Sequence, residues 1–258
     1  VIEEVGPEVK LFKVGDRVAH ASMPIGAYSE KHIMPENKLV PVPDGVSDEV
    51  ASCVTLKGIT AEYLLHRAYP LKKGDKVLYH AAAGALGQIL CPWANSIGAE
   101  IIGTVGSKEK EEIAKKNGCH HVINYTDKNF VEEVEKIVGK NGIDVVYDGV
   151  GLKTFEGSIE VLKIRGMMVA FGNASGYVDT IDVKKHINAK GLFFTRPSIA
   201  HYTIEREELL ESAKKVFNAF LSGKFKIEIS KKYSLDEVKQ AHEDLEGRLL
   251  TGPAVIKP

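Results

Sequence analysis

The chain has 258 residues, of which 44% are hydrophobic and 27% charged, and its formal net charge at pH 7 is -1. This length suits one large domain or two ordinary ones, and the balanced charge gives no overall field toward nucleic acid or an anionic membrane. No apolar run approaches the roughly 18 residues of a membrane-spanning helix, and the three cysteines form no Cys-x-x-Cys pair, which argues against a disulfide framework or a metal centre and favours a reducing, cytoplasmic compartment.

The N-terminal part of the chain, residues 1–50, is expected to form an all-β segment. It is rich in valine, glycine and proline, and the stretches 14–18 and 26–30 each read as a turn entering a short strand. Ser47 then offers a helix N-cap, because acidic residues occupy the next two positions.

Strand and helix patterns alternate through the middle of the chain. Strands are predicted at 76–80, 100–105, 121–124, 143–148, 166–171 and 191–195, and helices at 87–97, 108–117, 127–138 and 153–162. Alternation at this spacing implies right-handed βαβ crossovers and an α/β fold with a doubly wound parallel sheet of the Rossmann type. We assign residues 51–196 to this domain.

The end of the chain, residues 197–258, returns to a mixed pattern. A long helix is expected near 205–222, a strand near 226–233, a helix near 235–246 and a last strand at 253–257. Residues 197–258 are therefore assigned, with residues 1–50, to a second domain.

The turn that follows strand 76–80 carries the clearest functional pattern. Ala81 to Gly87 is a run of small residues between a short apolar strand and the start of a helix. The free amides at a helix start, together with the helix dipole, suit a pyrophosphate. One glycine-rich turn is only weakly specific, and a strand-turn-helix that uses small residues for close packing matches the same pattern.

The second strand bears on which dinucleotide would bind. An NAD site usually places Asp or Glu at the end of this strand, where the carboxylate holds the ribose 2'-hydroxyl. Strand 100–105 is followed instead by Gly106, with Lys108 and Lys110 close behind. A lysine attracts a 2'-phosphate that a carboxylate would repel, so the pattern favours NADPH over NADH. Glu109 dilutes this signal, and a solvated, charged helix start is the alternative.

Three further strand ends supply candidate contacts. Tyr125, after strand 121–124, is a candidate for the adenosine phosphate, with a surface tyrosine over the sheet edge as the alternative. Residues 147–151 read as a flexible loop whose backbone groups are free to approach a flat ring. The stretch 171–176 combines glycines with an amide side chain, as a nicotinamide carboxamide would require, although a plain turn uses the same residues.

Together these stretches carry a resemblance to one family. They are VGDRV at 14–18, GAYS at 26–29, LKGIT at 56–60, HAAAGALG at 80–87, GTVGS at 103–107, VINY at 122–125, FGNASG at 171–176, TRPS at 195–198 and LEGR at 245–248. The chain resembles the zinc-free quinone oxidoreductases, the zeta-crystallin-like NADPH:quinone reductases of the medium-chain dehydrogenase/reductase superfamily. The resemblance covers essentially the whole chain in order.

This resemblance implies a GroES-like β domain, formed by residues 1–50 and 197–258, beside the Rossmann domain, with NADPH bound between them. It also implies a set of cofactor-binding residues. They are Gly84, Ala85, Leu86 and Gly87 at the pyrophosphate; Lys110 and Tyr125 at the 2'-phosphate; Gly106; Val150, Phe171, Gly172, Asn173, Phe194 and Thr195 on the nicotinamide side; and Arg248, which would reach back to the cofactor.

The chain departs from the family pattern in two places. Ala85 stands where the family's Ala-Gly-Gly-Val-Gly turn has glycine, and binding is expected to survive because alanine tolerates helical angles. A family segment of about 60 N-terminal residues, roughly half of a small domain, has no counterpart in this chain. That segment supplies strands of the β domain and polar residues at the quinone pocket.

The activity implied is hydride transfer from NADPH to a small quinone, without a metal and with no side chain named as a general acid. Homodimers of the family pair across the strand that corresponds to 191–195. Two alternatives stay open: NADPH-dependent reduction of the C=C bond of an enone or 2-alkenal, and a non-enzymatic NADPH- and RNA-binding role. The near-neutral charge argues against nucleic acid, whereas lysine pairs such as Lys72-Lys73 keep it open.

Overall fold

The computed structural model describes residues 1–21, 23–247 and 249–258, so Arg248 lies outside the described residues. The chain divides into two compact units. One comprises Val1–Glu62 with Ile199–Pro258, and the other comprises Tyr63–Ser198. The second unit carries all the described residues that the sequence nominates for a cofactor.

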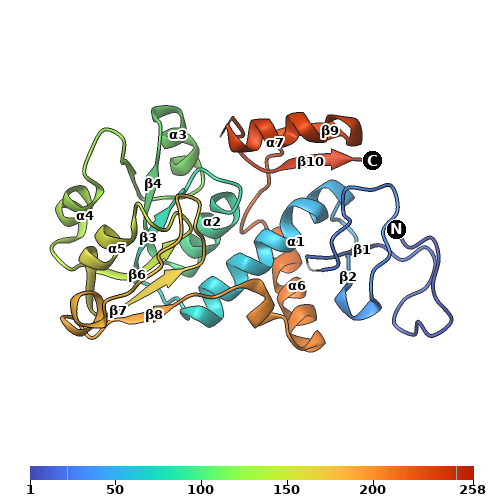
Figure 1. Ribbon diagram of the computed structural model, residues 1–258, viewed down its shortest axis with the longest axis horizontal. Helices are drawn as coiled ribbons and strands as arrows, with labels where there is room; N and C mark the ends of the chain where they lie inside the picture. The colour runs from blue at the N-terminus through green and yellow to red at the C-terminus, as the bar shows by residue number, and fades with distance from the viewer. Residues whose placement is uncertain (22, 248) are drawn as a thin grey trace. The chain divides into compact units, whose positions relative to one another are not determined.

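The Tyr63–Ser198 unit is built on a six-stranded parallel sheet (Figure 1). Its strands are β3 (Lys76–His80), β4 (Glu100–Val105), β5 (His121–Asn124), β6 (Ile143–Asp148), β7 (Leu162–Ala170) and β8 (Phe193–Thr195). Their spatial order is β5-β4-β3-β6-β7-β8. The chain adds strands to one side of β3 as far as β5 and then to the other side from β6 to β8, as in a doubly wound Rossmann sheet. The predicted fold class is therefore confirmed for this unit.

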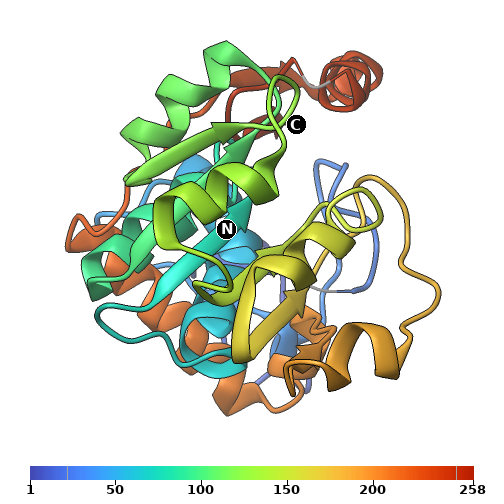
Figure 2. The same ribbon diagram turned by 90° about the vertical axis from the view of Figure 1, so that its left-hand side faces the viewer.

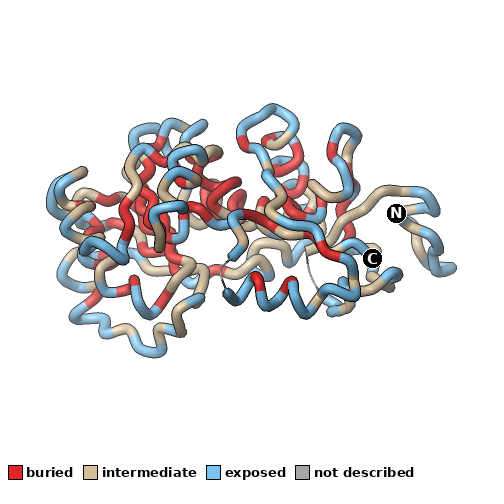
Figure 3. The backbone as a smooth tube through the Cα atoms, turned by 90° about the horizontal axis from the view of Figure 1, so that it is seen from above, coloured by how far each residue is buried: buried red, intermediate tan, exposed pale blue. Residues whose placement is uncertain are grey.

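Helices cover both faces of this sheet (Figure 2). They are α2 (Gly87–Ile97), α3 (Lys108–Lys116), α4 (Phe130–Val138) and α5 (Phe155–Val161), with two π-helical turns at η2 (Leu64–Ala68) and η3 (Val183–Asn188). Buried side chains from β3, β4, β6 and β7 form one core with α4 and α5, and right-handed crossovers place α2 and α3 on the opposite face. The strands β3, β4 and β6 and the helix α2 consist mostly of buried residues, and Figure 3 marks the buried stretches of the chain in red.

Two elements begin at residues other than those predicted. α4 begins at Phe130 rather than 127, because the Asn129 side chain accepts a hydrogen bond of 3.0 Å from the Val131 amide. β7 begins directly after α5 at Leu162 and not at 166, and its pairing with β6 shifts register between Ile143 and Val145.

The other unit is held by helix packing and one small parallel sheet. Its helices are α1 (Asp48–Tyr63), α6 (Arg206–Leu221) and α7 (Val238–Glu246), with 3-10 turns η1 (Glu36–Lys38), η4 (Ile199–Tyr202) and η5 (Leu235–Glu237), and its parallel strands are β9 (Lys231–Ser234) and β10 (Ala254–Lys257). The predicted cap is present, since the Val50 amide donates to Ser47 Oγ at 3.2 Å. Gly58 lets α6 approach α1, because a Cβ there would press into Val216.

The prediction of an all-β segment over residues 1–50 is wrong. Apart from the start of α1, the described part of this segment contains one 3-10 turn and two two-residue strands, β1 (Val18–Ala19) and β2 (Val40–Pro41), which pair with each other. Apolar side chains such as Ile25 and Ile33 are 85% and 92% exposed, so they present no buried face that would select a longer strand. The backbone is tied instead by contacts such as those of the Lys10 and Leu11 amides with Glu36 Oε2.

A buried carboxylate braces α7 against β9 and gives a pH prediction. Asp244 is 6% exposed and accepts from Lys231 Nζ at 2.7 Å, Tyr233 Oη at 2.5 Å and Gln240 Nε2 at 2.8 Å. The lysine first, then the hydroxyl and the amide, lower the pKa of Asp244 to about 2. Because the folded state holds this carboxyl ionised, the stabilisation is present above the unfolded pKa of about 3.9 and is lost as pH falls toward about 2.

We expect Asp244→Asn to lower the melting temperature at neutral pH and to flatten its decline between about pH 4 and pH 2. Thermal unfolding followed by circular dichroism at several pH values measures this. The exposed Asp236→Asn is the matched control and should keep the wild-type profile. An unchanged acid slope in D244N would show that other carboxyls dominate.

Candidate cofactor site

The predicted cofactor residues gather at one edge of the parallel sheet. Because all six strands run the same way, their carboxyl ends meet at that edge, where ligands of doubly wound sheets bind. Gly84–Gly87 follow β3, Gly106 follows β4, Tyr125 follows β5, Val150 follows β6, Phe171–Asn173 follow β7, and Phe194 and Thr195 lie in β8.

The turn between β3 and α2 is shaped by glycine. Gly87 is the first residue of α2, and a Cβ on it would overlap the carbonyl oxygen of Ala82 and lie 2.7 Å from the carbonyl carbon. Ala81 takes a left-handed backbone conformation with φ 65°, and its carbonyl accepts from the Gly84 amide at 2.9 Å. The turn is therefore tight enough that only glycine fits at position 87.

The start of α2 leaves backbone donors available for an anion. Within residues 1–21, 23–247 and 249–258, the amides of Ala85, Leu86 and Gly87 have no hydrogen-bond acceptor, and no side chain caps the helix. Gly84 is exposed and Ala85 half-buried, so this end of α2 is open to solvent. Uncapped amides at the positive end of a helix fit a pyrophosphate, and Ala85 does not close the turn.

The ends of β4 and β5 lie together. A Cβ on Gly106 would come within 2.7 Å of the Tyr125 hydroxyl, so these two residues are in contact. Lys110 is half-buried in the first turn of α3, which begins two residues after Gly106. The Glu109 carboxylate is held by its own backbone amide and by Ser107, which lower its pKa, so a negative charge shares this helix start with the lysine.

The loops after β6 and β7 are joined along their length. The Ser175 amide donates to the Val150 carbonyl at 2.8 Å, and the Ala174 amide to the Gly149 carbonyl at 3.3 Å. Gly172 presses against Gly149, where a Cβ would lie 2.7 Å from the Gly149 Cα. The structure thus brings Val150 and Phe171–Asn173 into one surface.

The prediction that residues 147–151 form a flexible loop with free backbone groups is wrong. The Val150 and Gly151 amides donate to Asp148 Oδ1 at 2.7 and 2.9 Å, and the Asp148 side chain is fully buried. Sequence reasoning gave no role to Asp148 or to His80, which the Ser158 hydroxyl connects to it. The available signal was an acid at the last position of an apolar strand, directly before Gly149 and Gly151.

The last predicted contacts lie on the edge strand. Phe194 and Thr195 are half-buried in β8, and the Phe194 ring packs edge-on to Phe155 with centroids 6.3 Å apart. The predicted contact of Arg248 falls outside the described residues.

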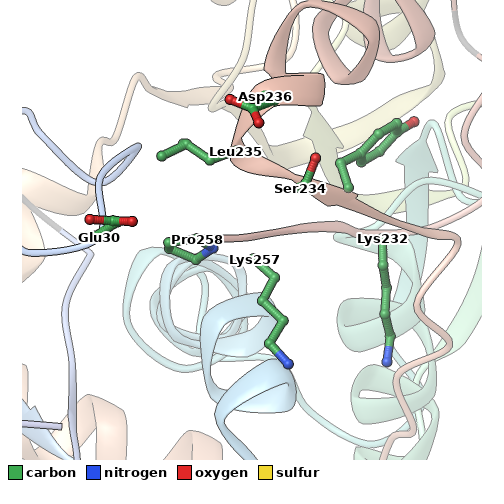
Figure 4. A pocket seen from close by; sticks show the side chains of 8 residues that line it. Glu30, Lys232, Ser234, Leu235, Asp236, Lys257 and Pro258 are labelled. Carbon is green, nitrogen blue, oxygen red and sulfur yellow. The ribbon is translucent and has the colours of Figure 1, made fainter.

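A separate pocket of about 550 Å³ lies in the other unit, between the loop at Glu30 and the pair β9–β10. Figure 4 shows Lys232 and Lys257 projecting to the same side of the pair, and Lys232 reaches Glu49 of α1 at 2.7 Å. Glu30 and Asp236 offset the two lysines, so the lining selects no single class of ligand. None of the described residues nominated for the cofactor lines this pocket.

Known proteins match both units of the chain. A family profile described as zinc-binding dehydrogenase matches residues 85–218. A quinone oxidoreductase of Pseudomonas aeruginosa is 42% identical over 257 residues, which cover 100% of this chain and 79% of the relative. The chain belongs to the quinone oxidoreductase family of medium-chain dehydrogenases/reductases.

Two further similar proteins bear on the chemistry. A 2-haloacrylate reductase of Burkholderia is 45% identical and is matched over 100% of this chain and 78% of its own length. The crystal structure of Escherichia coli quinone oxidoreductase complexed with NADPH superimposes with a TM-score of 0.95 at 42% identity, covering 99% of this chain and 79% of that one.

The zinc in the family description has no counterpart in the described ranges. Within them, no group of three or more His, Cys, Asp and Glu residues could hold a metal ion. The residues present therefore do not fit a zinc centre of the usual three or four protein ligands. No helix among the described residues is long and apolar enough to cross a membrane.

Proposed function

We propose that this chain is an NADPH-dependent reductase that transfers a hydride to a quinone without a metal. The observation that carries this proposal is the uncapped, glycine-shaped start of α2 at the carboxyl edge of the sheet. Relatives that share this fold over the whole chain are named quinone oxidoreductases, and one of them is complexed with NADPH.

The chain's own residues would bind and orient the cofactor. Gly84 to Gly87 would hold the pyrophosphate, while Lys110 and Tyr125, beside Gly106, would contact the 2'-phosphate. The joined loops after β6 and β7 and the strand β8 would align the nicotinamide, and Arg248 would reach the same cofactor. When bound, NADPH supplies the hydride, so the protein's task is alignment and exclusion of water. A quinone oxygen that gains charge takes a proton from solvent or a hydrogen-bond donor, and no side chain is assigned as general acid.

A second candidate is reduction of a C=C bond conjugated to a carbonyl or carboxylate. The specific observation in its favour is the 45% identity to a 2-haloacrylate reductase, which exceeds the 42% identity to the Pseudomonas quinone oxidoreductase. The cofactor site would be the same, because only the acceptor of the hydride differs.

Parallel initial-rate assays separate the two activities. With NADPH fixed, a naphthoquinone, a 2-alkenal and a 2-haloacrylate are each titrated, and NADPH oxidation without acceptor is the control. We expect the naphthoquinone to give the largest kcat/KM. A larger value for either alkene would transfer the proposal to the C=C reductase, and no acceleration by any acceptor would reject both.

We further propose that the protein is a cytoplasmic homodimer paired through β8. This strand bonds to β7 on one side, and Phe193 on it is 59% exposed. Three free, buried cysteines fit a reducing compartment. Sedimentation should give a dimer that Phe193→Glu dissociates, and a wild-type monomer would reject the pairing.

A further inference from the structure

A continuous buried chain of polar side chains runs beneath the cofactor edge. Its members are Thr104 at the end of β4, His80 at the end of β3, Ser158 in α5 and Asp148 at the end of β6, and each is at most 1% exposed. His80 Nδ1 lies 2.8 Å from Thr104 Oγ1, and His80 Nε2 lies 2.9 Å from Ser158 Oγ. Ser158 Oγ lies 3.3 Å from Asp148 Oδ2.

The direction of each hydrogen bond follows from the donors and acceptors. The Asp148 carboxylate can only accept, so the Ser158 hydroxyl donates to it and must accept from His80 Nε2–H. His80 Nδ1 then accepts from the Thr104 hydroxyl. Burial lowers the pKa of His80, with Asp148 opposing, so the imidazole is neutral with its proton on Nε2.

Asp148 holds both loops that make up the nicotinamide side. Its Oδ1 accepts the amides of Val150 and Gly151, and its backbone oxygen accepts those of Phe171 and Gly172 at 2.9 and 3.2 Å. Through His80 the same network reaches the last residue of β3, immediately before the turn that leads to Gly87. Asp148 therefore links the phosphate and nicotinamide ends of the edge, through its carboxylate to the loop after β6 and through its backbone oxygen to the loop after β7.

We propose that Asp148 is a positioning residue that fixes the nicotinamide loops relative to the phosphate turn, so that the cofactor ring is presented in one geometry. The proposal rests on the proposed function for its reaction. Asp148 does not contact the substrate in this role. Its carboxylate holds the Val150 and Gly151 amides and the Ser158 and Thr154 hydroxyls. Its backbone oxygen holds the Phe171 and Gly172 amides.

The test compares two isosteric changes on one strand. In Asp148→Asn, Oδ1 still accepts the two amides, but the new NH2 group faces the Ser158 and Thr154 hydroxyls. Asp144→Asn is the matched control, because Asp144 lies on β6 at its opposite end, accepts from the Lys76 amide at 2.7 Å and pairs with Lys163. For both variants, kcat with a naphthoquinone and the calorimetric Kd of NADPH and of 2',5'-ADP, which lacks the nicotinamide half, are measured.

We expect D148N to lower kcat by about 10- to 100-fold, because a neutral amide oxygen holds the Val150 and Gly151 amides more weakly than a carboxylate does, and a small misplacement of reacting groups has an effect of this size. Its Kd for 2',5'-ADP should stay within about twofold of wild type, and D144N should leave kcat and both Kd values unchanged. The Asn NH2 would donate to the Ser158 oxygen, which releases the Ser158 hydroxyl hydrogen from position 148 to donate to His80 Nε2. Histidine 15N NMR should therefore show the His80 proton moved to Nδ1 in D148N.

A parallel loss of kcat and of 2',5'-ADP binding, an unchanged kcat, or an unchanged His80 tautomer would overturn the proposal. If D148N does not fold, Thr154→Val removes the hydroxyl that donates to Asp148 Oδ2 at 2.7 Å and to the Gly151 carbonyl at 3.1 Å, and should give a smaller loss of the same pattern. Absence of quinone turnover in the wild type would reject the proposed function instead. The tautomer and the ratio of NADPH to 2',5'-ADP affinity would still decide the positioning role.

Discussion

Replacing Gly87 by alanine is expected to weaken NADPH binding by at least about 100-fold, which corresponds to roughly 2.7 kcal/mol. The added Cβ would overlap the Ala82 carbonyl oxygen and lie 2.7 Å from its carbon, and both are backbone atoms that cannot rotate away. The turn must open to relieve this contact. Opening it moves the free amides of Ala85, Leu86 and Gly87 away from the pyrophosphate that they would bind. Calorimetric titration with NADPH measures the loss.

Gly84→Ala is the matched control in the same turn. A Cβ on Gly84 would lie 3.2 Å from the Ala81 carbonyl oxygen, and Gly84 is exposed, so a small shift accommodates it. We expect G84A to bind NADPH within about fivefold of wild type, and circular dichroism to report native secondary structure for both variants. Wild-type affinity in a folded G87A protein would remove the turn from the cofactor site.

Replacing Lys110 by alanine should change the choice of cofactor. A charge-assisted contact with a phosphate contributes about 1.5–3 kcal/mol, so K110A should raise the Kd of NADPH by about 10- to 100-fold. The Kd of NADH, which has no 2'-phosphate, should change little. Because the attraction is electrostatic, the ratio between the two cofactors should also shrink with added salt in the wild type.

The control for this prediction is Lys115→Ala. Lys115 lies at the other end of α3, is exposed and pairs with Glu112 at 2.6 Å, so K115A removes the same charge away from the sheet edge. It should leave the NADPH-to-NADH ratio unchanged. An equal loss of NADPH and NADH binding in K110A would mean that Lys110 supports the helix rather than the 2'-phosphate.

Periodicity predicted the elements of the parallel sheet well because the sheet is buried on both faces. Strands 76–80 and 100–105 and helix 87–97 have their predicted bounds, since continuous apolar runs and a Gly98 stop mark them locally. The strand ends followed from the same reasoning, because parallel order alone brings Gly87, Gly106 and Val150 to one edge.

What the sequence did not predict depends on contacts between distant residues. Whether residues 1–50 pair as strands depends on the segments that pack against them, which no local pattern specifies. Their apolar side chains are largely exposed, and the predicted all-β segment does not form. Asp148 lies 68 positions from His80 in the sequence, so no local sequence pattern predicts the buried hydrogen bonds that connect them. Gly149 and Gly151 suggested a flexible loop, whereas the Asp148 carboxylate accepts hydrogen bonds from the Val150 and Gly151 amides and fixes the backbone there.

The most direct test of the central claim is the initial rate of NADPH oxidation by the purified chain as a naphthoquinone is titrated, repeated with NADH. The structure and its relatives lead us to expect saturable, quinone-dependent oxidation, with kcat/KM at least about tenfold higher for NADPH, which corresponds to roughly 1.4 kcal/mol. A rate independent of the quinone, or equal rates with NADH, would contradict the proposed NADPH:quinone reductase.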